Sequence, residues 1–376
     1  MKHIIIATIL IFSMQLAFSQ GDVKSKLDDL LKEYYPKDND PGIVLQVYDN
    51  NNNTIFAKGQ GIADLKTGRK IDLHTNFRMA SVSKQVTAAA IYQLIQENKI
   101  DVNTAMLSDF FPSLKGEIRN ATIPQLLNHS SGIVDYEEII PKGLKKQLRD
   151  SDVLKLIEPL DRVYFSPGTK FRYSNTAYCL LALIVEEVSG QGFSEYVWEH
   201  FFKPLNMQKS LVYNPEDEIK DRAFGYHLKG DEFVFADQSI TSATKGDGGV
   251  YTSANEYKLW NQAFIQLLEK DPAYSDFLTG NLIPMNKDCS YSIGKFIAKD
   301  QFGNLVYFHT GESTGFNNLV MSIPKKNINL SIFTNRDDKK INPFIEELLN
   351  IMDIQLMQQE KKPVFKWLSD TYANEH

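Results

Sequence analysis

Apolar and polar residues alternate near both ends of the chain, and the middle third has the spacing of short helices. The alternation predicts strands at 42–48 and 54–63, joined as a hairpin by the Asn-rich turn at 49–53. Further strands are predicted late in the chain, at 291–297, 305–308, 316–323 and 328–333. Strands that lie so far apart in the sequence are expected to meet in one sheet.

Helical spacing predicts a first helix at 23–34 and a last helix at 341–357. The strongest helical pattern is 81–98, which is apolar on most faces and therefore typical of a helix central to a core. Shorter helices are predicted at 123–127, 153–157, 176–188 and 193–202. The pattern indicates one α+β domain, with a mostly helical lobe at about 100–245 inserted into the sheet lobe.

The N-terminus has the features of a secretory signal peptide. Met1–His3 is cationic, Ile4–Phe18 is almost unbroken apolar sequence, and small residues precede a cleavage point after Ser19. The apolar run is shorter than the roughly 20 residues that span a bilayer. We therefore expect 1–19 to be removed and 20–376 to be periplasmic or secreted, by bacterial export, without a membrane span. An uncleaved anchor is the alternative.

Composition narrows the class of partner. The net charge is −6 and no basic run is present, which argues against nucleic acid and favours a small-molecule or peptide substrate. The histidines are scattered without metal-ligand spacing, so neither a metal nor a cofactor is expected. We expect Cys179 and Cys289 to be unpaired, and the protein to be a monomer.

Four Ser-x-x-Lys patterns occur in the chain, and context separates them. They are Ser81/Lys84, Ser242/Lys245, Ser292/Lys295 and Ser322/Lys325. Only Ser81 opens a long predicted helix, in which residues three apart share a face. A serine hydroxyl needs an adjacent base to become a nucleophile, and a lysine can supply it. The alternative for Ser81 is a helix-capping serine followed by a surface lysine.

Two further motifs follow Ser81 in order. Tyr173-Ser174-Asn175 precedes a predicted helix and supplies a phenol, and His309-Thr310-Gly311 lies on a late predicted strand. A similar triplet, Lys66-Thr67-Gly68, precedes Ser81 and is interpreted as a hairpin turn.

This order of motifs resembles the serine β-lactamase and penicillin-binding-protein superfamily, in the branch of class C β-lactamases, D-alanyl-D-alanine carboxypeptidases and related esterases. The resemblance runs from about Gly42 to Phe333 and implies a β-lactamase/transpeptidase-like fold with an antiparallel sheet flanked by the terminal helices. It implies that Ser81 forms an acyl-enzyme. Lys84 and Tyr173 would move protons, and the sequence leaves open which of them is the general base.

The resemblance also implies roles for the remaining motif residues. Asn175 would bind the substrate amide and steady Lys84, and the N–H groups of Ser81 and Glu312 would form the oxyanion hole. His309, Thr310 and Gly311 would face the carboxylate or leaving group of the substrate. Members of this branch usually carry lysine where His309 stands, and a mostly neutral imidazole attracts a carboxylate less strongly.

The expected activity is therefore hydrolysis of a D-alanyl-D-alanine-type peptide or a small ester. A class C-like β-lactamase is the first alternative, and a penicillin-binding receptor that acylates without turnover is an alternative of another class. Gly311–Gly315 matches the Gly-x-Ser-x-Gly nucleophile elbow around Ser313, but only His376 follows it, so it is interpreted as a turn. His129 is expected to end a helix and to bond loop backbone.

Overall fold

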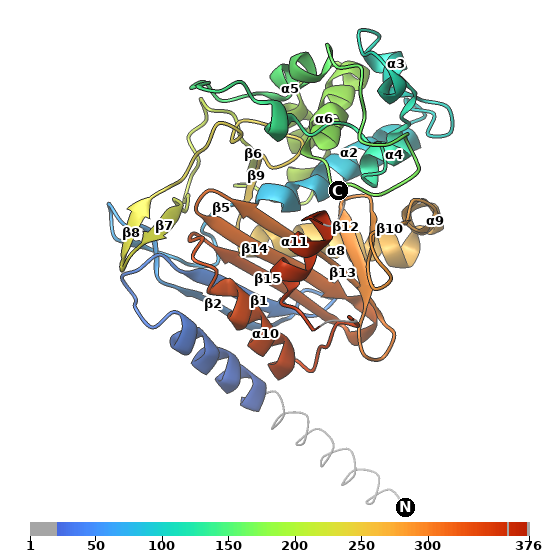
Figure 1. Cartoon of the computed structure of the whole chain (residues 1–376). Coiled ribbons are helices and arrows are strands. Elements are labelled where there is room, and N and C mark those ends of the chain that lie inside the picture. The colour runs from blue at the N-terminus through green and yellow to red at the C-terminus, as the bar shows by residue number, and fades with distance from the viewer. Residues whose placement is uncertain (1–20, 359–360, 374–376) are drawn as a thin grey trace, which may run out of the picture.

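An eight-stranded antiparallel sheet forms the centre of the computed structural model, which describes residues 21–358 and 361–373 (Figure 1). The strand order is β10-β11-β12-β13-β14-β15-β1-β2. The strands are β1 (Ile43–Tyr48), β2 (Thr54–Gln60), β10 (Ile283–Pro284), β11 (Ser290–Ser292), β12 (Lys295–Lys299), β13 (Leu305–Ser313), β14 (Phe316–Ile323) and β15 (Ile328–Thr334). The predicted signal peptide at 1–19 lies outside the described residues.

The first strands complete a sheet built by the last ones, as predicted. β1 pairs with β15 along its whole length, with Val44 opposite Phe333, and β2 pairs with β1 on the other side. The predicted strand at 291–297 is instead a hairpin of β11 and β12. Ile293 and Gly294 turn the chain there, both with positive φ, and a Cβ on Gly294 would lie 2.8 Å from the Lys84 carbonyl oxygen.

Helices cover both faces of this sheet. On one face lie the helix at 21–34, α10 (Ile341–Ile351) and α11 (Val364–Ala373), which enclose one apolar cluster (Figure 1). On the other face α8 (Ala254–Lys270) contacts β1 and β15. The last predicted helix is thus shorter than expected, and α8 and α9 (Pro272–Gly280) were not predicted.

A helical layer lies above the edge of the sheet, and a second, larger apolar cluster joins the two (Figure 1). Its helices are α2 (Lys84–Gln96), α3 (Leu107–Phe110), α4 (Ile123–Leu127), α5 (Asp150–Ile157), α6 (Asn175–Ser189) and α7 (Phe193–Val197). All four short helices predicted for this region are present, although the one predicted at 193–202 continues past α7 as a π-helical turn.

Three small sheets connect these layers. They are β3 (Ile62–Asp64) with β4 (Arg69–Lys70), β5 (Phe77–Arg78) and β6 (Leu211–Val212) with β9 (Val250–Thr252), and β7 (Tyr226–Lys229) with β8 (Glu232–Phe235). The Lys66-Thr67-Gly68 triplet forms the turn between β3 and β4, as predicted. Cys179 and Cys289 are both buried as free thiols. In the described part of the chain, no helix has the length and apolarity needed to cross a membrane.

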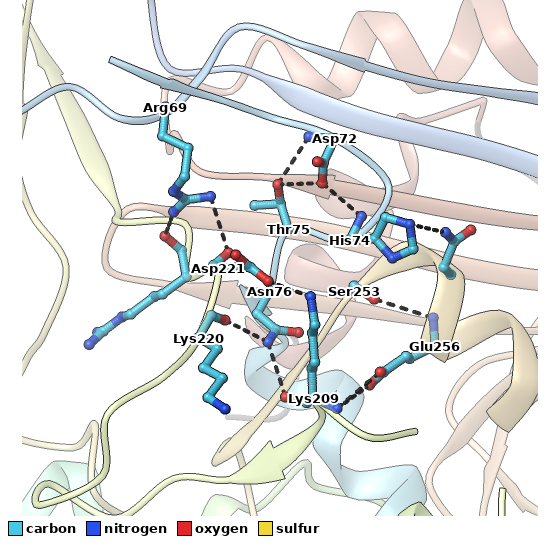
Figure 2. A network of polar contacts seen from close by, with 12 residues as sticks. Arg69, Asp72, His74, Thr75, Asn76, Lys209, Lys220, Asp221, Ser253 and Glu256 are labelled. Atoms are coloured by element: carbon cyan, nitrogen blue, oxygen red, sulfur yellow. Dashed lines mark hydrogen bonds and ion pairs between the residues drawn. The ribbon is translucent and has the colours of Figure 1, made fainter. Parts of the chain in front are cut away.

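A polar network holds the segment that leads into β5 (Figure 2). Asn76 is fully buried, and its side-chain amide donates to the carbonyl oxygens of Lys209 and Lys220. The Lys209 amide in turn donates to Glu256, at the start of α8, and its ammonium pairs with Asp221. The network therefore ties the chain just before Ser81 to two distant segments.

Candidate active site

Ser81 lies in a short 3₁₀ turn, η1 (Ala80–Ser83), which runs directly into α2. The residue before it, Ala80, has a φ of +48°, which costs energy for any residue with a Cβ and is found where the surroundings impose it. The turn is held from β9, because the Met79 amide donates to the Val250 carbonyl and the Val250 amide donates to Ser83 Oγ. Ser81 itself remains partly exposed. Its N–H lies in a first helical turn, where amides lack intrahelical acceptors.

Lys84 is fully buried, and its ammonium is surrounded by acceptors. Its Nζ donates to Ser81 Oγ at 3.1 Å, to Asn175 Oδ1 at 2.8 Å and to the Asp247 carbonyl oxygen at 2.9 Å. An ammonium has three protons, so these contacts use its full donor capacity. Lys84 therefore points at the serine and not at solvent, which excludes the capping-serine and surface-lysine alternative.

Tyr173 completes the group around the lysine. The Lys84 ammonium lies 4.9 Å from the centre of the Tyr173 ring. Enclosure by the surrounding protein raises the pKa of the Tyr173 phenol, while Lys84 and a hydrogen bond with Ser81 oppose that rise. The phenol thus contacts both members of the Ser81/Lys84 pair and keeps its proton at neutral pH.

Asn175 is the first residue of α6, and Ser174 caps that helix by accepting from the Ala177 amide. The Asn175 amide N–H donates to Asp135 Oδ2 at 2.9 Å, and its side-chain Nδ2 donates to Glu137 Oε1 at 3.2 Å. These two bonds direct the remaining Oδ1 toward Lys84. The structure thus brings Ser81 and Lys84 together with Tyr173 and Asn175 from two segments that lie far apart in the sequence.

Three acidic residues of this site were not identified from the sequence. Asp247 supplies the carbonyl for Lys84, and its carboxylate accepts from Tyr136 Oη at 3.2 Å. Glu137 keeps an exposed face, but the nearby protein and the carboxylates of Asp135 and Asp247 raise its pKa to about 7. The acidic pair in Asp135-Tyr136-Glu137, and an aspartate between two glycines at 246–248, were the available signals in the sequence.

A second acidic group lies behind Asp247. Asp150, Cys179 and Asp247 bring potential metal-ligand atoms within 4.8 Å of one another in the described part of the chain. The Asp150 carboxylate accepts the backbone N–H groups of Lys245 and Gly246, and burial raises its pKa to about 7. The chain itself therefore supplies donors to this carboxylate, which fix the loop that presents the Asp247 carbonyl to Lys84.

His309 does not lie where we expected it. We expected its ring to face the substrate, but the residue is fully buried and its ring centre lies 4.6 Å from that of Phe296. Nδ1 lies 2.6 Å from the Thr310 carbonyl oxygen, which only accepts, so Nδ1 carries the proton. Nε2 then accepts from Tyr291 Oη at 3.1 Å. Burial lowers the pKa of His309 to about 3, so the ring is neutral.

His129 has the structural role that was expected of it. It follows α4, is fully buried with a φ of +64°, and its Nδ1 accepts from the Ser174 amide at 3.1 Å. Its carbonyl oxygen accepts from the Arg172 amide, and its ring lies 4.2 Å from that of Tyr173. His129 therefore fixes the backbone on both sides of Tyr173 and contacts the phenol from behind.

The third motif lies along the free edge of β13. Pairing between β12 and β13 ends at Phe308, so residues 309–313 face η1 on that side. Thr310 is buried, and Glu312 is exposed at the end of the strand. Contact between β13 and η1 places the strand that carries Glu312 beside the turn that carries Ser81. The two N–H groups that would form an oxyanion hole thus come from adjoining elements.

Gly311 allows this close approach. A Cβ on Gly311 would lie 2.2 Å from the Met79 carbonyl oxygen, a contact between two backbones that neither can relieve by rotating a side chain. We expect Gly311→Ala to lower the free energy of unfolding by about 1–3 kcal/mol, the usual cost of overpacking. Activity should fall as well, since β13 must move away from η1.

Thermal or urea unfolding, together with an assay of the same samples, measures both effects. Gly280→Ala is the matched control, since nothing lies within 4 Å of a Cβ there. Equal stability and activity for Gly311→Ala and Gly280→Ala would show that the approach of β13 to η1 does not require glycine.

Ser313 is excluded as an alternative nucleophile by its place in the fold. It ends β13, and Gly315, with a φ of +75°, turns the chain into β14. A nucleophile elbow requires a turn from a strand into a helix. The Gly-x-Ser-x-Gly match is therefore the turn between strands that the sequence indicated.

Comparison with known proteins agrees with this geometry. Residues 27–348 match the Beta-lactamase family. Protein flp of Staphylococcus aureus is 26% identical over 334 residues, which are 87% of this chain and 66% of that relative. A penicillin-binding protein from Bacillus halodurans has 25% identity and a TM-score of 0.74, covering 87% of this chain and 98% of its own.

A D-amino acid amidase from Ochrobactrum anthropi is similar in fold, with 20% identity, a TM-score of 0.73, and coverage of 88% of this chain and 99% of its own. The family match spans both the sheet and the helical layer, and it contains all three motifs. The chain therefore belongs to the beta-lactamase family, within the superfamily of serine β-lactamases and penicillin-binding proteins.

Proposed function

We propose that this protein is an exported serine hydrolase that forms an acyl-enzyme on Ser81. One observation carries the proposal: a fully buried lysine ammonium is directed at a partly exposed serine hydroxyl by two further acceptors. Burial of a charged group costs free energy unless hydrogen bonds compensate for it. A buried lysine that is held by such bonds beside a reactive hydroxyl is typical of a catalytic site. The substrate is an amide or ester carbonyl.

In acylation, Ser81 Oγ attacks the carbonyl carbon and its proton passes to the Lys84/Tyr173 pair. Lys84 donates three hydrogen bonds at rest, so the reacting form of the pair is the one that has first released a proton to solvent and therefore has a free acceptor for the proton of Ser81. Which of the two groups takes the proton stays open, because Lys84 contacts both Ser81 and Tyr173. The carbonyl oxygen, negative in the intermediate, is held by the Ser81 and Glu312 N–H groups. The bond to the leaving group then breaks as the pair returns the proton to it.

In deacylation, water replaces the leaving group and the same pair moves its proton. Water attacks the acyl carbon, the bond to Ser81 Oγ breaks, and the serine recovers a proton. Glu137 adds a carboxyl group with a pKa raised to about 7 on the exposed side of Asn175. Its role in this scheme is to hold the Asn175 amide, so that Oδ1 stays on Lys84.

His309 takes a positioning role here instead of the substrate contact expected from the sequence. Its neutral ring packs 6.3 Å from the Tyr173 ring, centre to centre, and offers no charge to a substrate carboxylate. This favours small esters and D-amino acid amides, which carry no such carboxylate, over efficient β-lactam hydrolysis. D-alanyl-D-alanine-type peptides, which do end in a carboxylate, stay in the proposed set because the His309-Thr310-Gly311 motif resembles that of some D,D-peptidases. The penicillin-binding and D-amino acid amidase names of the similar structures support the same set.

A hydrolysis panel tests the proposed substrate class. Purified 20–376 is assayed with p-nitrophenyl esters, D-amino acid amides, D-alanyl-D-alanine peptides and a chromogenic β-lactam. We expect turnover of at least one of the first three and weaker turnover of the β-lactam, because no cation is available at position 309.

The same samples test the receptor alternative through the lifetime of a fluorescent penicillin adduct. A long-lived adduct with no turnover of any substrate would contradict the proposed hydrolase and indicate a penicillin-binding receptor. Efficient turnover of the β-lactam alone would contradict the proposed substrate class and indicate a class C-like β-lactamase.

A further inference from the structure

A separate cavity of about 220 Å³ lies between α2, α8 and α9. Lys84 does not line it, and the α2 residues that do lie mainly at 85, 89, 92, 93 and 96, to one side of the face that carries Lys84, with Ala88 at the border between the two. The walls are mainly aromatic and aliphatic, with Ala88, Tyr92, Trp260, Phe264, Tyr274 and Ile293 buried around it. Nothing in the proposed hydrolysis uses this space.

The deep end of the cavity contains a buried lysine. Lys295, on β12, is only 5% exposed, yet it has no ion pair among the described residues. Its Nζ donates to Gln85 Oε1 at 2.6 Å and lies 3.8 Å from the centre of the Phe264 ring. Burial alone lowers its pKa to about 7. An ammonium here lacks the carboxylate that buried lysines normally have.

Gln85, which lies beside Lys295, has a side-chain N–H group that is not used within the described part of the protein. The side chain is 4% exposed, and its Oε1 accepts from both Lys295 Nζ and Tyr257 Oη. Lysine has no acceptor, so this contact fixes which amide atom is the oxygen. The remaining Nε2 is buried without a partner in the described structure. A buried donor without an acceptor costs about 1–3 kcal/mol, so an acceptor in the cavity would be stabilised.

We propose that this cavity binds a small apolar carboxylic acid as its anion. The carboxylate would accept from Lys295 Nζ and Gln85 Nε2, and its aryl or alkyl group would pack against Phe264, Trp260 and Tyr274. An apolar cavity of about 150 Å³ holds a benzene molecule, so this one suits a ligand somewhat larger.

Asp271 is the acidic residue of the wall. Its carboxylate accepts from the Ala273 and Tyr274 amides and from Tyr92 Oη, so the chain satisfies it already. Its negative charge would direct the ligand carboxylate away from α9 and toward Lys295. The less buried residues Gln93, Gln96 and Leu267 mark the side from which a ligand enters.

Calorimetric titration of the full protein with phenylacetate and octanoate tests this site. We expect saturable binding of the acids and at least about tenfold weaker binding of phenylacetamide and octanol, which lack the charge that strengthens the hydrogen bonds. Lys295→Met should remove that preference. Lys299→Met is the matched control, because Lys299 lies on the same strand with its side chain exposed, and its affinity should not change.

Ala263→Phe is a second variant, which keeps Lys295 but fills the cavity from α8. It should abolish binding even if Lys295→Met fails to fold. No saturable binding to the wild-type protein would overturn the proposal, and so would unchanged affinity in Ala263→Phe. Because Ser81 takes no part in this binding, the result does not depend on the proposed hydrolysis.

Discussion

Ser81→Ala is expected to lower kcat by a factor of about 10⁶, the loss seen when the nucleophile of a serine hydrolase is removed. Without Oγ no acyl-enzyme forms, and the Lys84/Tyr173 pair has no proton to move. The fold should persist, because Ser81 is partly exposed and the turn is held by Met79 and Ser83 through β9. Steady-state hydrolysis and labelling by fluorescent penicillin should therefore both disappear while the unfolding temperature stays close to that of the wild type.

Ser313→Ala is the matched control for this substitution. It removes the hydroxyl of the competing Gly-x-Ser-x-Gly motif, which lies in the turn from β13 to β14. Wild-type hydrolysis and labelling are expected. Undiminished activity in Ser81→Ala together with loss of activity in Ser313→Ala would identify Ser313 as the nucleophile and contradict the mechanism.

Lys84→Met is expected to lower kcat by at least about 10³, because general acid–base catalysis typically contributes 10²–10⁴-fold and the pair acts as a unit. Methionine keeps the length of the side chain but removes all three hydrogen bonds of the ammonium. Stability should change less than activity. The buried acceptors lose a donor, but the cost of burying a charge is also removed.

The control for the lysine comes from another of the four Ser-x-x-Lys patterns. Lys245→Met changes a half-buried lysine whose backbone, and not its ammonium, holds Asp150. Stopped-flow acylation and urea unfolding are measured for both variants. Acylation that is equally fast in Lys84→Met and Lys245→Met would remove Lys84 from the mechanism.

Much of the fold followed from local patterns in the sequence. The hairpin at 42–63 and the late strands could be predicted, because alternation of apolar and polar residues with a period of two indicates half-buried strands. The helix of Lys84 was readable from its apolar faces, and its start separated Ser81 from three similar serines. The hairpin of β11 and β12 was missed, because Ile293 and Gly294 turn within a run that otherwise alternates.

The parts of the site that were missed depend on tertiary contacts. Asp247 acts through a backbone carbonyl, which no side-chain pattern encodes. The neutral state of His309 follows from its burial against Phe296 and its bond to Tyr291. Both partners lie on other strands, far from the motif in the sequence. The motif therefore predicted which residues gather at the site, but not which of them face a substrate.

The central claim, that Ser81 becomes acylated, is tested most directly by mass-spectrometric mapping of the protein after a short reaction with fluorescent penicillin or a p-nitrophenyl ester. The account predicts one acyl group, located on the peptide that contains Ser81 and absent from Ser81→Ala. An acyl group on a different residue of the wild-type protein, or hydrolysis that proceeds with no acyl group at any time, would contradict it.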